Sequence, residues 1–378
     1  MERRPVQVWM LPEQEAVVRA VLELASATAS VVGCDDDHAR PTLAAGINAH
    51  GGIGDGPAAR PAADLRNLLA SAAPADGPLV LFDSGMLLRG DRAGPDAELL
   101  REARERGVAV LTLEPLPPTA PDLMAAAGSL APTAAPAPVL LGPADLPLSP
   151  ERGAAMRNVT DLVWLAGLAR HAPGFSDIPD LLAQFGAVHS MAVVTTGSRA
   201  EGSLRARMAD GLDLLALVMG QPESVMATVS KQAAASAVHC HATAQLRYGQ
   251  GRSATLMIAL RGGPVQRHTV LTGPGGRLEI SGSGLVWTDD AGKVIDRSKR
   301  RARHLTRAGE AGEQQPYSVL CEQVAKQLRR VLDSGTSDVL AATGRPDIAM
   351  LVATINAAEL SSETGASERP ATHLSAGG

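Results

Sequence analysis

Aromatic side chains are scarce in this sequence of 378 residues, and basic residues do not outnumber acidic ones. Phe, Trp and Tyr together make up 2% of the chain, so the hydrophobic core must consist mainly of aliphatic side chains. So few rings exclude a stacking platform for single-stranded nucleic acid. The net charge of −5 also lacks the basic surplus with which a nucleic-acid binder displaces counterions. We therefore expect no nucleic-acid partner.

Cysteines are few, and long apolar runs are missing. The three cysteines are an odd number at wide spacing, which is not a disulfide framework. No apolar run reaches the roughly 18 residues that a membrane-spanning helix needs, and the one near the N-terminus is too short for a signal peptide. With 45% hydrophobic and 20% charged residues, the composition is that of a globular protein. We expect a cytoplasmic protein without membrane contact.

The first third of the chain alternates strand-like and helix-like segments. Short apolar runs at 6–10, 79–82 and 108–113 are typical of buried parallel strands. Residues 13–27 place apolar side chains at helical spacing. Strand, helix and strand in this order predict βαβ units and a parallel sheet over residues 1–120.

The second half of the chain follows a different pattern. Residues 121–150 are rich in proline and alanine and predict a connection between two domains. Within 244–260, apolar and polar side chains alternate around a Gly-Gln-Gly turn, which predicts an antiparallel hairpin with one buried face. We therefore expect a second domain over 151–365 with an antiparallel sheet, and a disordered tail over 366–378.

Four short motifs follow one another in an informative order. They are GVAVLTLEPL at 107–116, the helix residues Leu212-Asp213-Leu214 with Gly220-Gln221-Pro222, LRYGQGRSATL at 246–256, and GPGGRLEI at 273–280. Together they resemble the family of glucose–fructose oxidoreductase, inositol dehydrogenase and MocA. The resemblance implies an α/β fold: an N-terminal Rossmann-like parallel sheet, then a C-terminal α/β domain with a large, open, mainly antiparallel sheet. It also implies an NAD(P)-dependent oxidoreductase of a sugar, cyclitol or related polyol.

The first strand-to-helix turn, at residues 11–16, departs from the family. The family's turn is rich in glycine, because glycine lets the backbone approach the pyrophosphate of the dinucleotide. Here the turn has no glycine, Pro12 lacks an N–H donor, and Glu13 and Glu15 bring negative charge. We therefore predict that pyrophosphate binding is disfavoured, although acids at a helix N-terminus also simply stabilise the helix.

The resemblance assigns roles to five residues. Asp35 follows the second strand, where an acid binds the adenosine ribose, and Glu114 and Pro115 correspond to a Glu-Lys-Pro motif that lacks its lysine here. Asp210 stands where the family has a catalytic histidine, and Asp213 is the acid that follows. Spaced three apart, Asp210 and Asp213 share a helix face. Such a pair can act as a base, bind a cation, or form an ordinary polar face.

Two further segments concentrate chemistry-bearing side chains. His239 and His241 lie on the same side of a predicted strand, but a closed zinc site needs four ligands, so we expect no metal site. The basic run at 297–304 is suited either to an anionic ligand or to a solvated loop.

Two classes of function remain open, and so does whether the chain is an enzyme. Loss of the glycine turn, the lysine and the histidine together favours a non-catalytic or regulatory relative with impaired NAD(P) binding. The alternative is an active oxidoreductase with NAD or NADP that uses Asp210 as its base on a sugar-like small molecule. A weaker option is a different small molecule in the same cleft. We also predict a homo-oligomer through the outer face of the C-terminal sheet, because an open sheet has a second face to cover.

Overall fold

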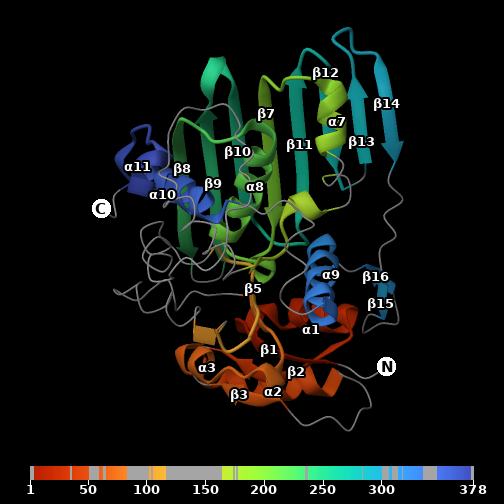
Figure 1. The fold of residues 1–378 in the computed structure, drawn as a ribbon, viewed down its shortest axis with the longest axis vertical. Coiled ribbons are helices and arrows are strands. Elements are labelled where there is room, and N and C mark those ends of the chain that lie inside the picture. The colour runs from red at the N-terminus through yellow and green to blue at the C-terminus, as the bar shows by residue number, and fades with distance from the viewer. Residues whose placement is uncertain are drawn as a thin grey trace.

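The computed structural model describes residues 4–34, 36–50, 59–62, 65–82, 102–103, 105–115, 164–172, 175, 178–234, 237–282, 284–299, 306–308, 314–316, 318–334 and 347–375. These residues form two lobes, each built on its own sheet (Figure 1). Among the helices of these residues, we find none with the length and apolar character needed to cross a bilayer.

The N-terminal lobe contains a six-stranded parallel sheet, as the apolar runs predicted. The strand order is β3-β2-β1-β4-β5-β6, and every neighbouring pair is parallel. The order reverses between β1 and β4, which is the position where open α/β sheets bind ligands. The strands are β1 (Arg4–Trp9), β2 (Ala27–Gly33), β3 (Arg60–Ala62), β4 (Leu79–Leu81), β5 (Val110–Thr112) and β6 (Trp164–Leu165).

Helices cover both faces of this sheet. α1 (Glu15–Ala25), α2 (Ala39–His50) and α9 (Val319–Ser334) share one apolar core with it, and α3 (Leu65–Ser71) packs on the other side. The helix expected within 13–27 is α1. α9 lies beside α1 although it comes from near the end of the chain (Figure 1). The division into domains at 1–120 and 151–365 stays a proposal. β6 and α9 come after residue 151 in the chain, yet they pair and pack with the N-terminal sheet.

The C-terminal lobe contains an eight-stranded sheet in the order β14-β13-β12-β11-β7-β10-β9-β8. β7 and β10 pair in parallel, and the other described pairs are antiparallel. The hairpin predicted within 244–260 is β9 and β10. The strands are β7 (Ser190–Gly197), β8 (Ser224–Ala234), β9 (Ala237–Arg247), β10 (Ser253–Leu260), β11 (Gln266–Gly273), β12 (Gly276–Ser281), β13 (Gly284–Thr288) and β14 (Val294–Lys299). A separate two-stranded sheet joins β15 (Thr306–Ala308) and β16 (Gln314–Pro316).

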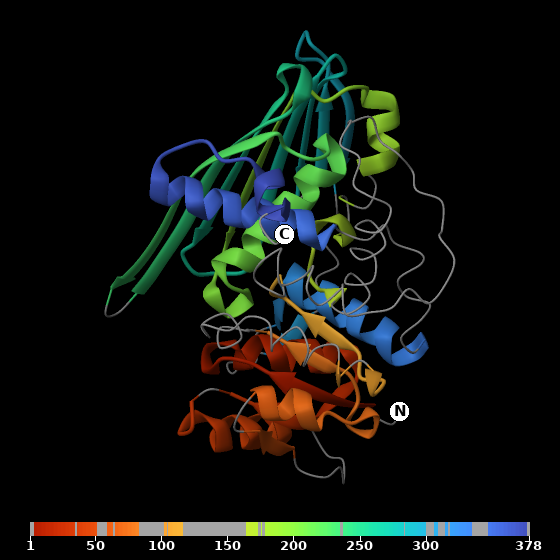
Figure 2. The same ribbon diagram turned by 60° about the vertical axis from the view of Figure 1, so that its left-hand side comes forward.

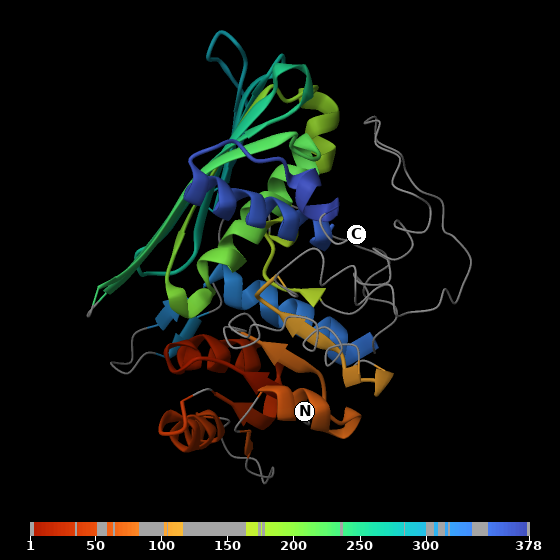
Figure 3. The ribbon, with the colours of Figure 1, turned by 90° about the vertical axis from the view of Figure 1, so that its left-hand side faces the viewer.

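The helices of this lobe gather on one face of the large sheet. They are α7 (Ile178–Phe185), α8 (Leu204–Met219) and α10 (Ile348–Thr364), and Figures 2 and 3 show them on the same side. Their apolar side chains and the inward residues of the strands form one core, in which the rings of Phe185 and Trp287 lie 5.8 Å apart. In the described part of the chain, no helix covers the opposite face (Figure 3).

The end of the chain is more ordered than its composition predicted. We expected disorder from residue 366, but Glu368 forms a β-bridge with Val225, and α11 (Pro370–Ser375) follows. A short polar segment gains this order by pairing its backbone with β8, which local composition does not reveal. The proline- and alanine-rich connection at 121–150 and residues 300–304 of the basic run lie outside the described residues.

Candidate functional site

The carboxyl end of β5 meets the amino end of α8 where the two lobes join. Glu114 lies just beyond β5 and is fully buried. Its Oε1 accepts the backbone N–H of Ser203 at 3.1 Å, and its Oε2 accepts the Ser203 hydroxyl at 2.6 Å. Ser203 is the N-cap of α8, so the positive end of the helix dipole stabilises this carboxylate. Glu114 thus links the lobes.

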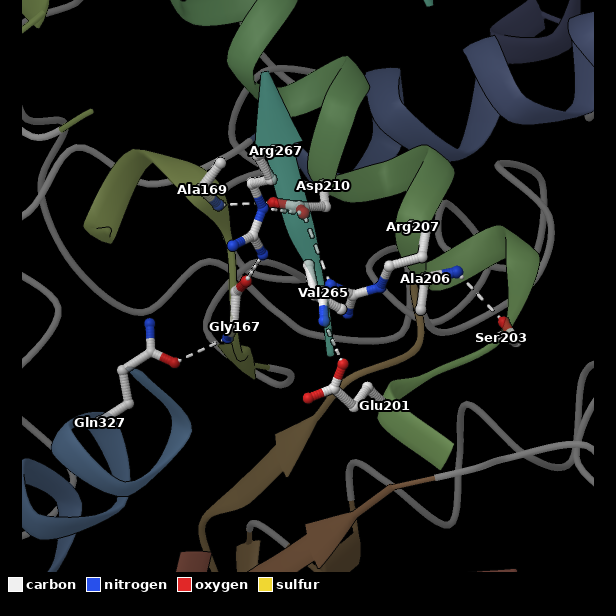
Figure 4. Close-up of polar contacts among 10 residues, drawn as sticks. All are labelled: Gly167, Ala169, Glu201, Ser203, Ala206, Arg207, Asp210, Val265, Arg267 and Gln327. Carbon is white, nitrogen blue, oxygen red and sulfur yellow. Dashed lines mark hydrogen bonds and ion pairs between the residues drawn. The ribbon is translucent and has the colours of Figure 1, made fainter. Parts of the chain in front are cut away.

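Asp210 of α8 lies at the centre of a buried polar cluster (Figure 4). Its Oδ2 accepts from Nε of Arg267 at 2.7 Å, and its Oδ1 accepts the backbone N–H of Ala169, at the start of the 3-10 helix η3 (Ala169–His171). Arg267 of β11 also donates to the carbonyl of Gly167 at 2.9 Å. Both oxygens of Asp210 therefore have protein donors.

Asp213 has an arginine of its own. Arg170 of η3 approaches both carboxylate oxygens, with Nε at 2.5 Å from Oδ2. Burial raises the pKa of Asp213 to about 6, and the neighbouring Arg170 opposes that rise. Asp210 and Asp213 thus both contact η3, but separate guanidinium groups neutralise them.

Arg207 is the least satisfied member of the cluster. Its side chain is 1% exposed, and its Nε has no hydrogen-bond partner in the described residues. Its shortest ionic contact in the described residues joins Nη1 to Oδ2 of Asp210 at 3.5 Å. Burial lowers the pKa of Arg207. We call Glu114, Glu201, Arg207, Asp210 and Arg267 the junction cluster.

The turn between β1 and α1 is filled by the side chain of Gln14. This side chain is fully buried; its Oε1 accepts the N–H of Leu11 at 2.8 Å, and its Nε2 donates to the carbonyl of Phe82 at 3.1 Å. The backbone N–H of Gln14 donates to Leu11 within the 3-10 helix η1 (Pro12–Gln14), and that of Glu15 donates to Pro12. The turn therefore uses most of its own donors.

A second contact crosses from the C-terminal lobe to this turn. The 3-10 helix η4 (Arg199–Glu201) packs against η1. Nε of Arg199 lies 3.4 Å from Oε1 of Glu13, and both side chains are a little under half exposed. Glu201, at the end of η4, accepts the backbone N–H of Val265. The loop before α8 is thus held on one side by the turn and on the other by the large sheet.

The other candidate residues of the sequence analysis are Asp35, Pro115, His239 and His241. Asp35 lies outside the described residues, whereas its neighbour Asp36 accepts the N–H groups of His38 and Ala39 at the start of α2. Pro115 is buried beside Glu114. His241 is exposed, and the side chain of His239 is outside the described part. In that part, no three His, Cys, Asp or Glu side chains converge as metal ligands.

Sequence reasoning missed three charged residues of the cluster, namely Glu201, Arg207 and Arg267. One signal was available for Arg267, because it shares the inward side of β11 with Thr269 and Leu271, which are buried. A charge on the buried side of a strand needs a partner. Arg207 gave a weaker signal, since it precedes Asp210 by one helical turn.

Comparison with known proteins yields likenesses of fold. No family model matches the sequence, and no curated protein matches it either. GenD2 from gentamicin A biosynthesis, solved with NAD, is 17% identical with a TM-score of 0.60, over 98% of this chain and 97% of that one. An oxidoreductase from Agrobacterium radiobacter, solved with NAD+, L-tartaric acid and magnesium, is 13% identical with a TM-score of 0.62, over 98% and 100%. Levoglucosan dehydrogenase, solved with NADH and levoglucosan, is 12% identical with a TM-score of 0.60, over 97% and 99%.

The fold is therefore that of two-domain Rossmann-like oxidoreductases, which agrees with the architecture that the sequence motifs implied. These solved structures contain NAD or NADH, so the turn after β1 must be tested for its fit to a dinucleotide. It fits poorly. Gln14 occupies the N–H of Leu11, Pro12 has no N–H, and Glu13 adds a negative charge that would face the phosphates.

Proposed function

We propose that this chain is a non-catalytic or regulatory relative of the NAD(P)-dependent oxidoreductases, with impaired binding of NAD or NADP. The observation that carries the proposal is the Gln14 side chain within the turn after β1. A pyrophosphate needs free backbone N–H groups at a helix N-terminus. Gln14 joins Leu11 to Phe82 instead, so binding of the phosphates would first require breaking both hydrogen bonds.

The junction cluster supports the same proposal. A general base must reach its substrate with an oxygen that is available for a proton. Asp210 accepts from Arg267 and from the backbone of Ala169, so both of its oxygens are occupied. Glu114 is similarly held by Ser203. These groups stabilise the joint between the lobes, as expected of a scaffold that assembles with other subunits or regulates them.

One observation favours the alternative, an active oxidoreductase of a sugar, cyclitol or related polyol. Burial raises the pKa of Asp213 to about 6, and a general base works best when its pKa lies near the working pH. Asp213 is, however, 0% exposed and paired with Arg170. It would have to exchange this partner for a substrate before it could accept a proton.

Titration of the purified protein with NADH and NADPH tests the proposal, with fluorescence and thermal shift as readouts. A ligand bound only by the folded state stabilises it by about 2.7 kcal/mol at 100 times its dissociation constant. We expect neither nucleotide to produce such a shift at millimolar concentration. Sub-micromolar binding of either one would contradict the proposal and place the active oxidoreductase first.

A variant of the turn after β1 with free backbone N–H groups provides a second test of the proposal. The triple variant Pro12→Gly, Glu13→Ala, Gln14→Ala frees the N–H of Leu11 and removes one negative charge. We expect it to bind NADH at least about tenfold more tightly than the natural sequence, which corresponds to about 1.4 kcal/mol. Glu23→Ala, an exposed acid farther along α1, is the control and leaves binding unchanged.

A further inference from the structure

The carboxylates of the junction cluster have donors other than Arg207. Glu114 is bound by Ser203, Glu201 accepts the N–H of Val265, and Asp210 accepts from Arg267 and Ala169. The nearest acid to Arg207 is Asp210 at 3.5 Å, and the charges of Glu201 and Glu114 act on it from farther away. Charge-assisted bonds of this kind normally measure roughly 2.7–2.9 Å. The guanidinium is therefore buried with a weak partner (Figure 4).

The unsatisfied edge of Arg207 faces Gly202. A Cβ built on Gly202 would lie 3.2 Å from Nη2 and 3.4 Å from Nε of Arg207. Gly202 also has φ of +129°, a backbone conformation that favours glycine. No side chain of residue 202 covers the guanidinium at this edge. The Nε and Nη2 edge is one that can bind a carboxylate through two parallel hydrogen bonds.

The junction cluster holds three carboxylates and two guanidinium groups, and each carboxylate has a donor besides Arg207. The helix dipole of α8 offsets the negative charge of Glu114, and Arg267, at 2.7 Å, offsets that of Asp210. Glu201 is the remaining acid, and the N–H of Val265 holds one of its oxygens. Arg170 and Asp213 neutralise each other nearby. An incoming carboxylate would thus approach a guanidinium whose neighbouring acids are each bound by another donor.

We propose that the junction binds a small organic acid, with its carboxylate on the Nε and Nη2 edge of Arg207 beside Gly202. Arg207 is 1% exposed, so the segment 198–202 withdraws to admit the ligand, while Ser203 stays bound to Glu114. Glu13–Arg199 and Glu201–Val265 are the contacts that hold this segment in place. The inference rests on the proposed function, since it assigns a ligand-binding role to the junction of a chain without dinucleotide chemistry.

The experiment uses the full chain without added nucleotide. Calorimetry and thermal shift compare succinate with succinamide and gluconate with sorbitol, which pairs each acid with a neutral analogue of similar size, at constant ionic strength. We expect the acids to bind and to raise the melting temperature, and the neutral analogues to do neither. Equal binding of acid and neutral analogue, or binding of neither, would overturn the inference.

Two variants then locate the site. Arg207→Gln removes the charge. Gly202→Ala keeps the charge but places a methyl group against the Nε and Nη2 edge of Arg207. We expect each to weaken binding of the acid at least tenfold, whereas Arg277→Gln, at an exposed arginine of β12, has no effect. Unchanged affinity in a folded Arg207→Gln or Gly202→Ala protein overturns the inference. If neither variant folds, the comparison of acids with neutral analogues on the natural sequence decides.

Failure of this inference differs from failure of the proposed function. Tight binding of NADH contradicts the proposed function whatever the acids do. Absence of acid-specific binding overturns the organic-acid site and says nothing against a degenerate cofactor turn.

Discussion

Glu114 and Ser203 are 89 positions apart in the chain, yet the carboxylate of Glu114 binds Ser203, the N-cap of α8. Two hydrogen bonds, of 3.1 and 2.6 Å, join the end of β5 to the start of α8. The resemblance assigned Glu114 to cofactor binding. In the fold it connects the N-terminal sheet to the main helix of the C-terminal lobe.

The first prediction concerns this connection. Glu114→Gln keeps one acceptor but removes the charge and turns an amide N–H₂ toward a donor of Ser203. We expect the free energy of unfolding to fall by about 1–3 kcal/mol, the usual cost of an unsatisfied buried polar group. Urea unfolding measures it. Glu102→Gln, at a partly exposed surface pair with Arg106, should change stability by less than about 0.5 kcal/mol. Equal losses in both variants would contradict the prediction.

Asp210→Asn tests whether Asp210 is structural. The change leaves Arg267 and Arg207 buried without their shared counter-charge. Breaking a buried ion pair on one side costs about 3–5 kcal/mol, and we expect a loss of that size in urea unfolding. Asp296→Asn, at an exposed position of β14, is the control. A stable Asp210→Asn protein would show that the carboxylate is dispensable to the fold and would support a catalytic role.

The stability of the protein should respond to pH through two groups of opposite sign. The pKa of Asp213 is raised to about 6 by burial, so its penalty for being charged is absent below pH 3.8 and complete above pH 6. Alone, it lowers stability as pH rises. The pKa of His171 is lowered to about 4, by burial first and by the neighbouring Arg170 second. Its penalty for being protonated is absent above pH 6.5 and grows as pH falls toward 4.

Substituting one of the two groups should reveal the pH dependence that the other contributes. Between pH 4 and 6 the two effects oppose each other, so His171→Gln should make the free energy of unfolding fall more steeply as pH rises through this window. The change in slope stays below about 1.4 kcal/mol per pH unit, because one proton is involved and His171 is only half-buried. Asp213→Asn should change the slope in the opposite direction. Urea unfolding across the window measures both, and identical slopes would contradict the prediction.

The uncovered face of the large sheet leads to a prediction about assembly. We propose that the chain forms a homodimer or tetramer through this face, where Met226 is 54% and Met257 is 47% exposed. Met257 projects outward with Ser253, Thr255 and Ala259, opposite the buried residues of β10. Apolar and small side chains on an open sheet are suited to burial against a second copy.

Light scattering at micromolar concentration tests the assembly. The natural sequence should be oligomeric, and Met257→Glu should produce monomers because it would bury a charge in the interface. Leu360→Glu adds the same charge on α10, on the side of the sheet that the helices cover, and should leave the oligomer intact. A monomeric natural sequence would contradict the proposal.

The sequence alone determined the local character of both lobes. Apolar runs at 6–10 and 79–82 indicated buried parallel strands, and the period-two pattern of 244–260 indicated β9 and β10. The absence of glycine from the turn at 11–16 was visible from the start. These features follow from backbone conformation and from which side of an element is apolar, and both are recorded within a few consecutive residues.

The tertiary structure alone decided which groups meet. Asp210 receives Arg267 from 57 positions away, and Asp213 receives Arg170 from 43 positions away. The apolar pattern of a helix or strand indicates that a polar side chain on its buried side needs a partner, but it does not identify the residue that supplies one. That choice depends on the packing of α8 between η3 and the sheet. For the same reason, the sequence placed two acids on one helix face, and only the fold showed that arginines neutralise them and leave Arg207 unsatisfied.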